Sequence, residues 1–398
     1  MTKERQLTAG NQRLNVKALM DSAAKTPTMA EVAAKAGVSK MAVSLALRGS
    51  PRVSEAKRKM ILEVAAAMNY RPNPQVQTLM ANLRATRPVE MHSVIAWITT
   101  FGTEFGWEKH RVSVDYFKGA LLRGKELGYR VEPMWAFSKG MRGSRLSDVL
   151  AARGINGVII PPTPNTETQL DLRWEELASA TIGYSFTQPK LHRAAANLPD
   201  AMSVALHKCE QLGYERIGFV ITSDTDFRVN HSWMAVYLAW QHFQKPSRVL
   251  PIHYVAENTP IEKHLGAWVK KHKPDVIISP YREIKLWLPE MLGINIPEDV
   301  GYVSLANRAD QYLDMLGVKV SGIDQQDDAI GAAAVDLVVA QLQRNEKGLP
   351  VTPKVVLTEG LWRDGETVGK KIKPAKQQPA KKVKGRAVRK KPLATKSS

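Results

Sequence analysis

The sequence predicts an all-α helix-turn-helix headpiece followed by an α/β core of two lobes, each a parallel sheet with helices on both faces. Short capped helical segments between residues 28 and 68 predict the headpiece. Strand-like apolar runs that alternate with amphipathic helices from residue 88 onward predict parallel βαβ units. This α/β region has about 280 residues, more than one hydrophobic core usually holds, so two lobes with a cleft between them are expected.

The headpiece is predicted from its helix-start and helix-stop signals. Thr28 and Glu31 have the spacing of a capping box, and Gly37 suits the left-handed turn after a helix. Ser39 is expected to cap a second helix over 40–47, and Ser54 a third helix running to about residue 68. The buried stripe of that third helix is expected to hold Ile61, Leu62, Val64, Ala65 and Met68. Two short helices joined by a tight turn are a DNA-binding signature when the second helix is exposed.

The core is predicted from alternating elements. Helices are expected at about 112–127 and 144–153. Strands are expected at 93–98, 129–135, 157–160, 180–185, 216–221, 250–255, 275–279, 300–305 and 318–323. Ligands of such folds bind beyond the carboxyl ends of the strands. The predicted organisation is a flexible leader (1–26), the headpiece (27–72), a hinge helix or linker (73–87), the two-lobed core (88–369) and a disordered tail rich in Lys and Arg (370–398).

The formal net charge of +19 is divided unevenly along the chain. Residues 1–87 carry +10, residues 88–369 carry −3 and residues 370–398 carry +12. Two basic ends around a near-neutral body indicate a polyanionic partner. The single cysteine, Cys209, excludes an internal disulfide framework and favours a reducing compartment. No apolar run is long enough for a membrane span or a secretion signal, so an intracellular protein without a membrane partner is expected.

Residues 28–70 carry a resemblance to a known family. They read TMAEVAAKAGVSKMAVSLALRGSPRVSEAKRKMILEVAAAMNY, and the chain continues with Arg71-Pro72-Asn73. This segment resembles the headpiece of the lac-repressor (LacI/GalR) family over about 45 residues. Looser similarities follow at 212–219, 296–300 and 322–325. The resemblance implies a periplasmic-binding-protein-like core, a palindromic double-stranded DNA operator, and assembly as a homodimer, with a tetramer left open.

The resemblance also implies roles in DNA binding. Base edges in the major groove would be read by Lys40, Met41 and Leu45. Lys40 is suited to guanine acceptors, and the two apolar side chains are suited to a thymine methyl group. Backbone phosphates would be contacted by Thr28, Ser39, Ser44 and Asn73.

A second DNA-binding element is implied at the hinge. Leu79 falls where family members place a leucine that wedges into a minor-groove step and kinks the duplex. The alternative is that Leu79 packs on the hinge helix of a partner subunit.

The family's effector cleft suggests a further set of residues. The resemblance implies that an arginine of the family binds the ligand at the position where this chain has Trp233. Arg228 could take its place. The other candidates are Phe105, Trp107, Tyr281, Asn307 and Gln325. The competing interpretation is that the two tryptophans are core residues and that Asn307 and Gln325 cap loops.

These observations predict a DNA-binding transcriptional repressor controlled by a small molecule, a saccharide or related metabolite, bound between the lobes. It would act in the bacterial cytoplasm, on the nucleoid. The alternative is an architectural DNA-binding protein that has lost effector sensing, suggested by the basic tail. No phosphate loop, metal-ligand spacing or nucleophile elbow is found, so neither an enzyme nor a cofactor or metal is expected.

Overall fold

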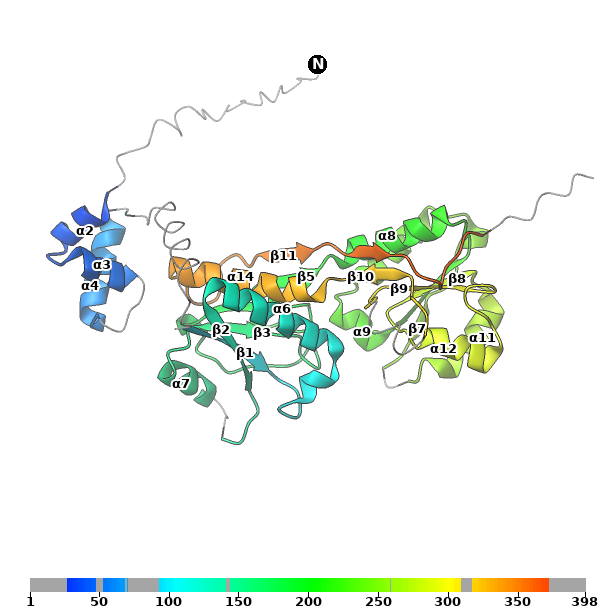
Figure 1. Ribbon diagram of the computed structural model, residues 1–398, viewed down its shortest axis with the longest axis horizontal. Coiled ribbons are helices and arrows are strands. Elements are labelled where there is room, and N and C mark those ends of the chain that lie inside the picture. Colours follow the sequence, from blue (N-terminus) through cyan, green and yellow to red (C-terminus); the bar gives the residue numbers. More distant parts are fainter. Residues whose placement is uncertain are drawn as a thin grey trace, which may run out of the picture.

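The computed structural model describes residues 27–371 except 48–52, 69, 71–92, 141–143, 258 and 309–316. The predicted leader and hinge, with Asn73 and Leu79, and the predicted tail from residue 372 onward therefore lie outside the described residues. The remainder forms a small helical headpiece and two α/β lobes, the fold class predicted from the sequence (Figure 1).

The headpiece is built from three helices, α2 (Met29–Lys35), α3 (Lys40–Leu47) and α4 (Glu55–Ala67). They enclose an apolar core in which Val32, Val43 and Ile61 are fully buried. The capping box predicted at Thr28 is present, and Gly37 adopts a left-handed φ of 64°. The Ala42 N–H donates to Ser39 Oγ over 3.2 Å, which confirms the second cap.

The third cap is only partly as expected. Ser54 occupies the N-cap position of α4, but its side chain makes no capping hydrogen bond. Along α4, Ile61 and Ala65 are buried, whereas Leu62, Val64 and Met68 are only half-buried. A three-helix unit of this size has too little interior to bury a whole helical stripe.

The first lobe contains a six-stranded sheet in the order β11-β5-β4-β3-β1-β2. Its strands, all parallel to their neighbours, are β1 (Ser93–Thr99), β2 (Tyr129–Trp135), β3 (Gly157–Ile160), β4 (Ala178–Ile182), β5 (His192–Ala196) and β11 (Val355–Thr358). Helices α6 (Arg111–Leu127) and α14 (Asp327–Arg344) cover one face, and α7 (Arg145–Ala152) covers the other. Side chains along β1 alternate between these faces, with Ile95 and Trp97 toward α6 and α14 and with Ala96 and Ile98 toward α7.

The second lobe repeats this plan in the order β12-β10-β9-β8-β6-β7. Its strands are β6 (Ile217–Thr222), β7 (His253–Val255), β8 (Val276–Ser279), β9 (Gly301–Ser304), β10 (Gly322–Asp324) and β12 (Leu361–Arg363), of which β12 is antiparallel to β10. Its helices are α8 (Leu198–Gln211), α9 (Ser223–Arg228), α10 (Ser232–His242), α11 (Glu262–His272) and α12 (Ile284–Leu292). Short 3-10 turns occur in the first lobe at η1 (Gly106–Lys109) and η2 (Trp174–Glu176), and in the second lobe at η3 (Pro246–Arg248). Both lobes share a strand order of the doubly wound type, although the sequence shows no repeat.

Three segments connect the lobes, and hydrogen bonds join them. The chain crosses between β5 and α8, between β10 and α14, and between β11 and β12. The side-chain nitrogen of Asn197, on the first crossing, donates to the Glu359 carboxylate of the third over 3.0 Å. Gln326, on the second crossing, donates to the Glu359 carbonyl oxygen over 2.6 Å. The three crossings are therefore held together by side-chain hydrogen bonds.

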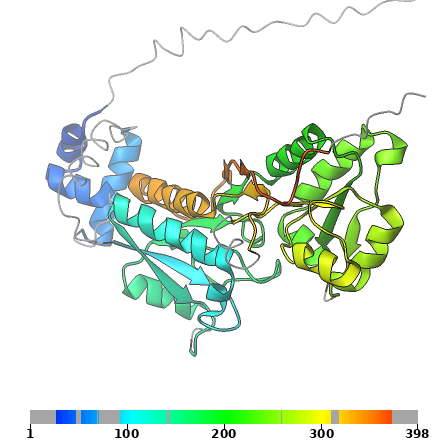
Figure 2. The ribbon, with the colours of Figure 1, turned by 45° about the vertical axis from the view of Figure 1, so that its right-hand side comes forward.

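Helices α6 and α14 lie side by side on the first lobe in both views (Figures 1 and 2). Two glycines permit this close approach. A Cβ atom on Gly331 would lie 1.9 Å from the Tyr116 carbonyl oxygen, and one on Gly119 would lie 1.9 Å from the Asp328 carbonyl oxygen. The two helices therefore meet backbone to backbone, immediately beside the second crossing.

Several strands were predicted well and others were missed. Residues 129–135 and 157–160 form strands with the predicted bounds, whereas the strand expected at 250–255 is shortened to His253–Val255. Strands β5, β11 and β12 were not predicted. Their positions at the sheet edge or at a crossing depend on pairing with distant segments, which a local pattern does not reveal.

Candidate nucleic-acid interface and interlobe site

The second headpiece helix presents two of its three predicted base-reading residues to solvent. Lys40 is exposed, and Met41 leaves 66% of its surface accessible. Leu45 is half-buried and packs against the headpiece core, so only part of its side chain is available for a base contact. Because α3 begins at Lys40, the two exposed residues form its first turn, the part of a recognition helix that reaches base edges.

The predicted phosphate contacts differ in availability. Ser39 is exposed beside the start of α3. The Thr28 hydroxyl is engaged in its capping box: it accepts from the Glu31 N–H over 3.3 Å and donates to the Glu31 carboxylate over 3.1 Å. Ser44 lies on α3, but its side chain is outside the described residues, as are Asn73 and Leu79. The described interface thus centres on the first turn of α3.

The effector candidates predicted for the first lobe lie in the loop at the carboxyl end of β1. The loop after β1 contains Phe105, which is 62% exposed, and Trp107, which is only 5% exposed. The Trp107 ring packs edge-on against Phe117, with ring centroids 5.1 Å apart, and is therefore part of the packing of the first lobe. The Trp135 indole N–H donates to the Phe101 carbonyl over 2.8 Å and anchors the start of this loop.

On the second lobe, the structure separates Trp233 from Arg228. Trp233 is 4% exposed in the core at the start of α10, and its indole nitrogen has no partner among the described residues. Arg228, at the end of α9, reaches the first lobe and donates to the Pro164 carbonyl over 2.9 Å. Arg228 therefore lies at the contact between the lobes, and Trp233 does not.

The remaining predicted effector residues are engaged within the protein. Tyr281 is half-buried, and its hydroxyl lies 2.6 Å from the Thr222 hydroxyl at the end of β6. The side chain of Asn307 is 1% exposed and donates to the Val320 carbonyl over 2.7 Å. Gln325 is 6% exposed and donates to the Leu305 carbonyl over 2.6 Å. Asn307, Gln325, Trp107 and Trp233 are therefore all buried, with little of their surface accessible to a ligand.

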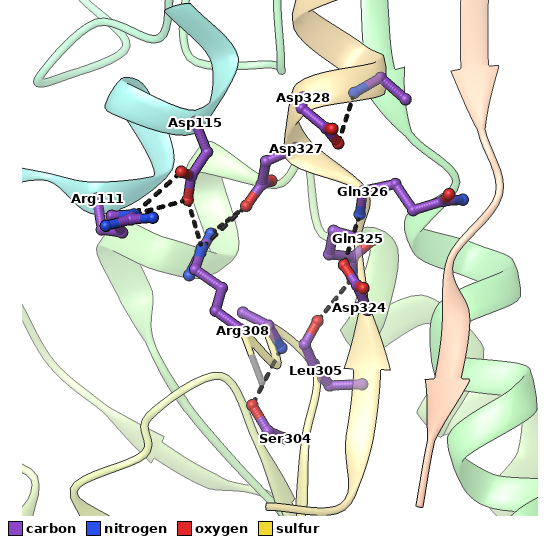
Figure 3. Close-up of polar contacts among 12 residues, drawn as sticks. Arg111, Asp115, Ser304, Leu305, Arg308, Asp324, Gln325, Gln326, Asp327 and Asp328 are labelled. Atoms are coloured by element: carbon purple, nitrogen blue, oxygen red, sulfur yellow. Dashed lines mark hydrogen bonds and ion pairs between the residues drawn. The ribbon is translucent and has the colours of Figure 1, made fainter. Parts of the chain in front are cut away.

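A charged cluster that was not predicted joins the two lobes (Figure 3). Arg308 follows β9 in the second lobe, and Asp327 begins α14 on the first; their side chains form an ion pair at 2.8 Å. Arg308 also lies 3.9 Å from Asp115 of α6, and Asp115 in turn pairs with Arg111 at 3.0 Å. The cluster therefore couples the second lobe to both α6 and α14.

Burial sets the electrostatics of this cluster. Asp327 is 9% exposed, and burial raises the pKa of its carboxyl group, an effect that neighbouring Arg308 opposes. Burial and the neighbouring Asp327 carboxylate raise the pKa of Tyr116 well above its usual range. Nothing local in the sequence indicates that Arg308 would lie beside Asp327, so the cluster was not predicted.

Comparison with known proteins identifies the headpiece. Residues 28–73 match the family model described as "Bacterial regulatory proteins, lacI family". A curated relative, the "HTH-type transcriptional regulator reg1" of Streptomyces lividans, is 26% identical over 202 residues, which are 49% of this chain. The match spans 54% of that relative, so this chain covers about half of the relative's length.

Solved structures share the fold of most of the chain. A "transcriptional regulator CelR-cellobiose complex" matches with a TM-score of 0.51 and 16% identity, covering 86% of this chain and 99% of that one. The lac repressor dimer bound to operator and the anti-inducer ONPF matches with a TM-score of 0.50 and 16% identity, covering 87% and 100%. A LacI transcriptional regulator from Lactobacillus brevis matches with a TM-score of 0.52 and 16% identity, covering 68% and 100%.

The three-helix headpiece is thus a helix-turn-helix domain of the lacI family of bacterial regulatory proteins. The paired α/β lobes share the fold of the solved lacI-type regulators. Within the described residues, no group of three or more His, Cys, Asp or Glu side chains is placed to hold a metal ion. A search of the same residues finds no helix with the length and apolar character needed to cross a membrane.

Proposed function

We propose that this protein is a sequence-specific, non-enzymatic transcriptional repressor that binds a palindromic operator as a homodimer in the cytoplasm. The observation that carries the proposal is the exposed first turn of α3, where Lys40 and Met41 stand at the surface of a domain matching the lacI family model. A lysine and an apolar side chain at that place suit a guanine and a thymine methyl group.

The proposed control is a small molecule bound between the lobes. Its support is the arrangement of two doubly wound sheets, in which ligands typically bind beyond the carboxyl ends of the strands, together with the three connected crossings that would allow the lobes to move as units. A saccharide or related metabolite is the proposed class, since a structural neighbour is described as a complex with cellobiose. The ligand would act through different affinities for the open and closed arrangements of the lobes.

The test is operator selection from a random duplex library, followed by binding measurements on Lys40→Ala. The variant should lose about tenfold or more in affinity for the selected site, because one base contact contributes about 1–3 kcal/mol of discrimination. Lys57→Ala is the matched control, since Lys57 is an exposed lysine on α4 rather than α3. Equal losses in the two variants, or no selected sequence, would contradict the proposal.

The second candidate function is an architectural DNA-binding protein. It is favoured by the +12 charge of residues 370–398. A 1–369 truncation separates the two functions, because a sequence reader keeps its preferred site while the dependence of affinity on salt becomes shallower. Loss of sequence preference with the tail would support the architectural function instead.

A further inference from the structure

The last described residues of the chain are held on the second lobe by hydrogen bonds. Thr367 is 1% exposed, and its hydroxyl donates to the Tyr302 carbonyl of β9 over 2.7 Å. The Lys371 N–H donates over 2.8 Å to the carbonyl of Leu212, the C-cap residue of α8. The part of the chain that follows residue 371 therefore begins at a defined point, the end of α8.

This point lies on the lobe that is not joined to the headpiece. The chain enters the core at Ser93, the first residue of β1 in the first lobe, and leaves it from the second lobe. In both views of the molecule the headpiece lies beside the first lobe, and the last residues in red lie on the second (Figures 1 and 2). The two basic ends of the chain are thus attached to opposite ends of the core.

Residues 372–398, here called the basic segment, have a composition suited to DNA phosphates. They contain ten Lys or Arg and no Asp or Glu in 27 positions. They also contain no aromatic residue, so stacking on unpaired bases is not available to them. Double-stranded DNA carries about one charge per 1.7 Å of its axis, a density that a run of lysines and arginines can match without reading sequence.

The core offers the basic segment little compensation for its charge. Residues 88–369 carry a net charge of only −3. On either side of the end of α8, Glu210 accepts from the Trp240 indole N–H over 2.9 Å, and Glu215 pairs with Arg248 at 2.9 Å. These carboxylates are engaged within the second lobe. Most of the charge of the basic segment is therefore left for an external polyanion to balance.

The distance to be covered favours a second duplex over the operator itself. A path from the end of α8 back to the headpiece passes the second lobe and then α14, whose 18 residues extend about 27 Å along the first lobe. Stretching the basic segment over that path costs conformational entropy. Away from the core, 27 residues can span at most about 90 Å. A duplex that approaches the second lobe from solvent lies within this reach.

We propose that this protein bridges two DNA segments. The headpieces hold the operator, and the basic segment holds the phosphate backbone of a second duplex without sequence preference. This inference rests on the proposed operator binding and adds a separate DNA-binding element on the other lobe. A homodimer carries two basic segments, so their individually weak phosphate contacts reinforce each other.

The test immobilises the selected operator duplex on beads and measures how much of a labelled duplex without the site is captured by the bound full chain. The protein retained on the beads is quantified separately. The unmodified protein should capture the second duplex. Its apparent affinity for that duplex should fall about a thousandfold or more between about 50 and 200 mM salt, the loss expected for six or more phosphate contacts.

Two variants assign the capture to the basic segment. A chain that ends at residue 371 keeps the described contacts of the second lobe, and it should be retained on the operator without capturing a second duplex. A full-length chain with Gln at each Lys and Arg position of residues 372–398 should behave in the same way.

Two controls separate charge from sequence and one end of the chain from the other. Shuffling the order of residues 372–398 keeps their charge and should keep the capture. Deletion of residues 1–26, which carry five Lys or Arg before the headpiece, should also leave the capture unchanged.

The outcomes distinguish this inference from the proposed repressor function. No retention on the operator would contradict the repressor function, on which bridging depends. Retained protein that captures no second duplex would overturn the bridging inference alone. Capture that persists in the chain ending at residue 371 would also overturn it, because further headpieces would then hold the second duplex. So would weaker binding of that truncated chain to an operator with long flanks when no variant captures a second duplex, since the basic segment would then contact the operator's own duplex.

Discussion

The headpiece and the interlobe cleft expose their predicted functional residues very differently. On α3, Lys40 and Met41 face solvent, as a recognition helix requires. In the cleft, Trp107, Trp233, Asn307 and Gln325 are each less than 7% exposed and are engaged in packing or backbone contacts. The difference shows that a helix surface can be inferred from nearby residues, whereas the lining of a cleft between two lobes is determined by distant segments.

The largest predicted effect is a loss of stability of the two lobes when a glycine at the contact between α6 and α14 is replaced. Gly331→Ala should destabilise the two lobes by about 3 kcal/mol, since its Cβ would lie 1.9 Å from the Tyr116 carbonyl and force α6 and α14 apart. Chemical denaturation followed by tryptophan fluorescence measures the change, because all the tryptophans of the chain lie outside the headpiece. Gly102→Ala is the control, as no heavy atom lies within 4 Å of its Cβ position. Similar denaturation midpoints for Gly331→Ala and Gly102→Ala would contradict the backbone contact between α6 and α14.

The next effect concerns the charged cluster between the lobes. Arg308→Met should cost about 2 kcal/mol of unfolding free energy, because it leaves the Asp327 carboxylate, 9% exposed, without its ion-pair partner. Arg344→Met removes an ion pair of similar length in which both side chains are about half exposed, and it should cost less than about 0.5 kcal/mol. The same denaturation assay compares them. If both variants lose equally little, the cluster does not stabilise the junction of the lobes.

The smallest effect is confined to the headpiece. Thr28→Ala should reduce its local stability by about 1 kcal/mol through loss of the capping box, and leave the core unchanged. Hydrogen exchange of amides on α2 reports the change in the full chain. Ser54→Ala serves as control, because Ser54 makes no side-chain cap bond in α4. Equal acceleration of exchange in α2 and α4 by their respective variants would show that the cap bond is unimportant.

Much of the fold was accessible from local patterns. Strands such as Ile217–Thr222 are apolar runs, and the headpiece helices carry their own start and stop signals. The edge and crossing strands β5, β11 and β12 were missed because their conformation depends on distant partners; for example, Val355–Thr358 pairs with Arg193–Ala196. The identical strand order of the lobes was equally invisible, since the two halves share a topology without a sequence repeat.

The candidate sites also divide into features that local sequence predicts and features that depend on distant contacts. The sequence by itself determined the headpiece helices and the class of fold, because these depend on helix caps, periodicity and charge within short segments. Only the tertiary structure decided that Arg228 reaches Pro164, that Trp233 is buried, and that Arg308 meets Asp327. These contacts join residues far apart in the sequence, and a side chain's burial or charge balance depends on neighbours that only folding supplies.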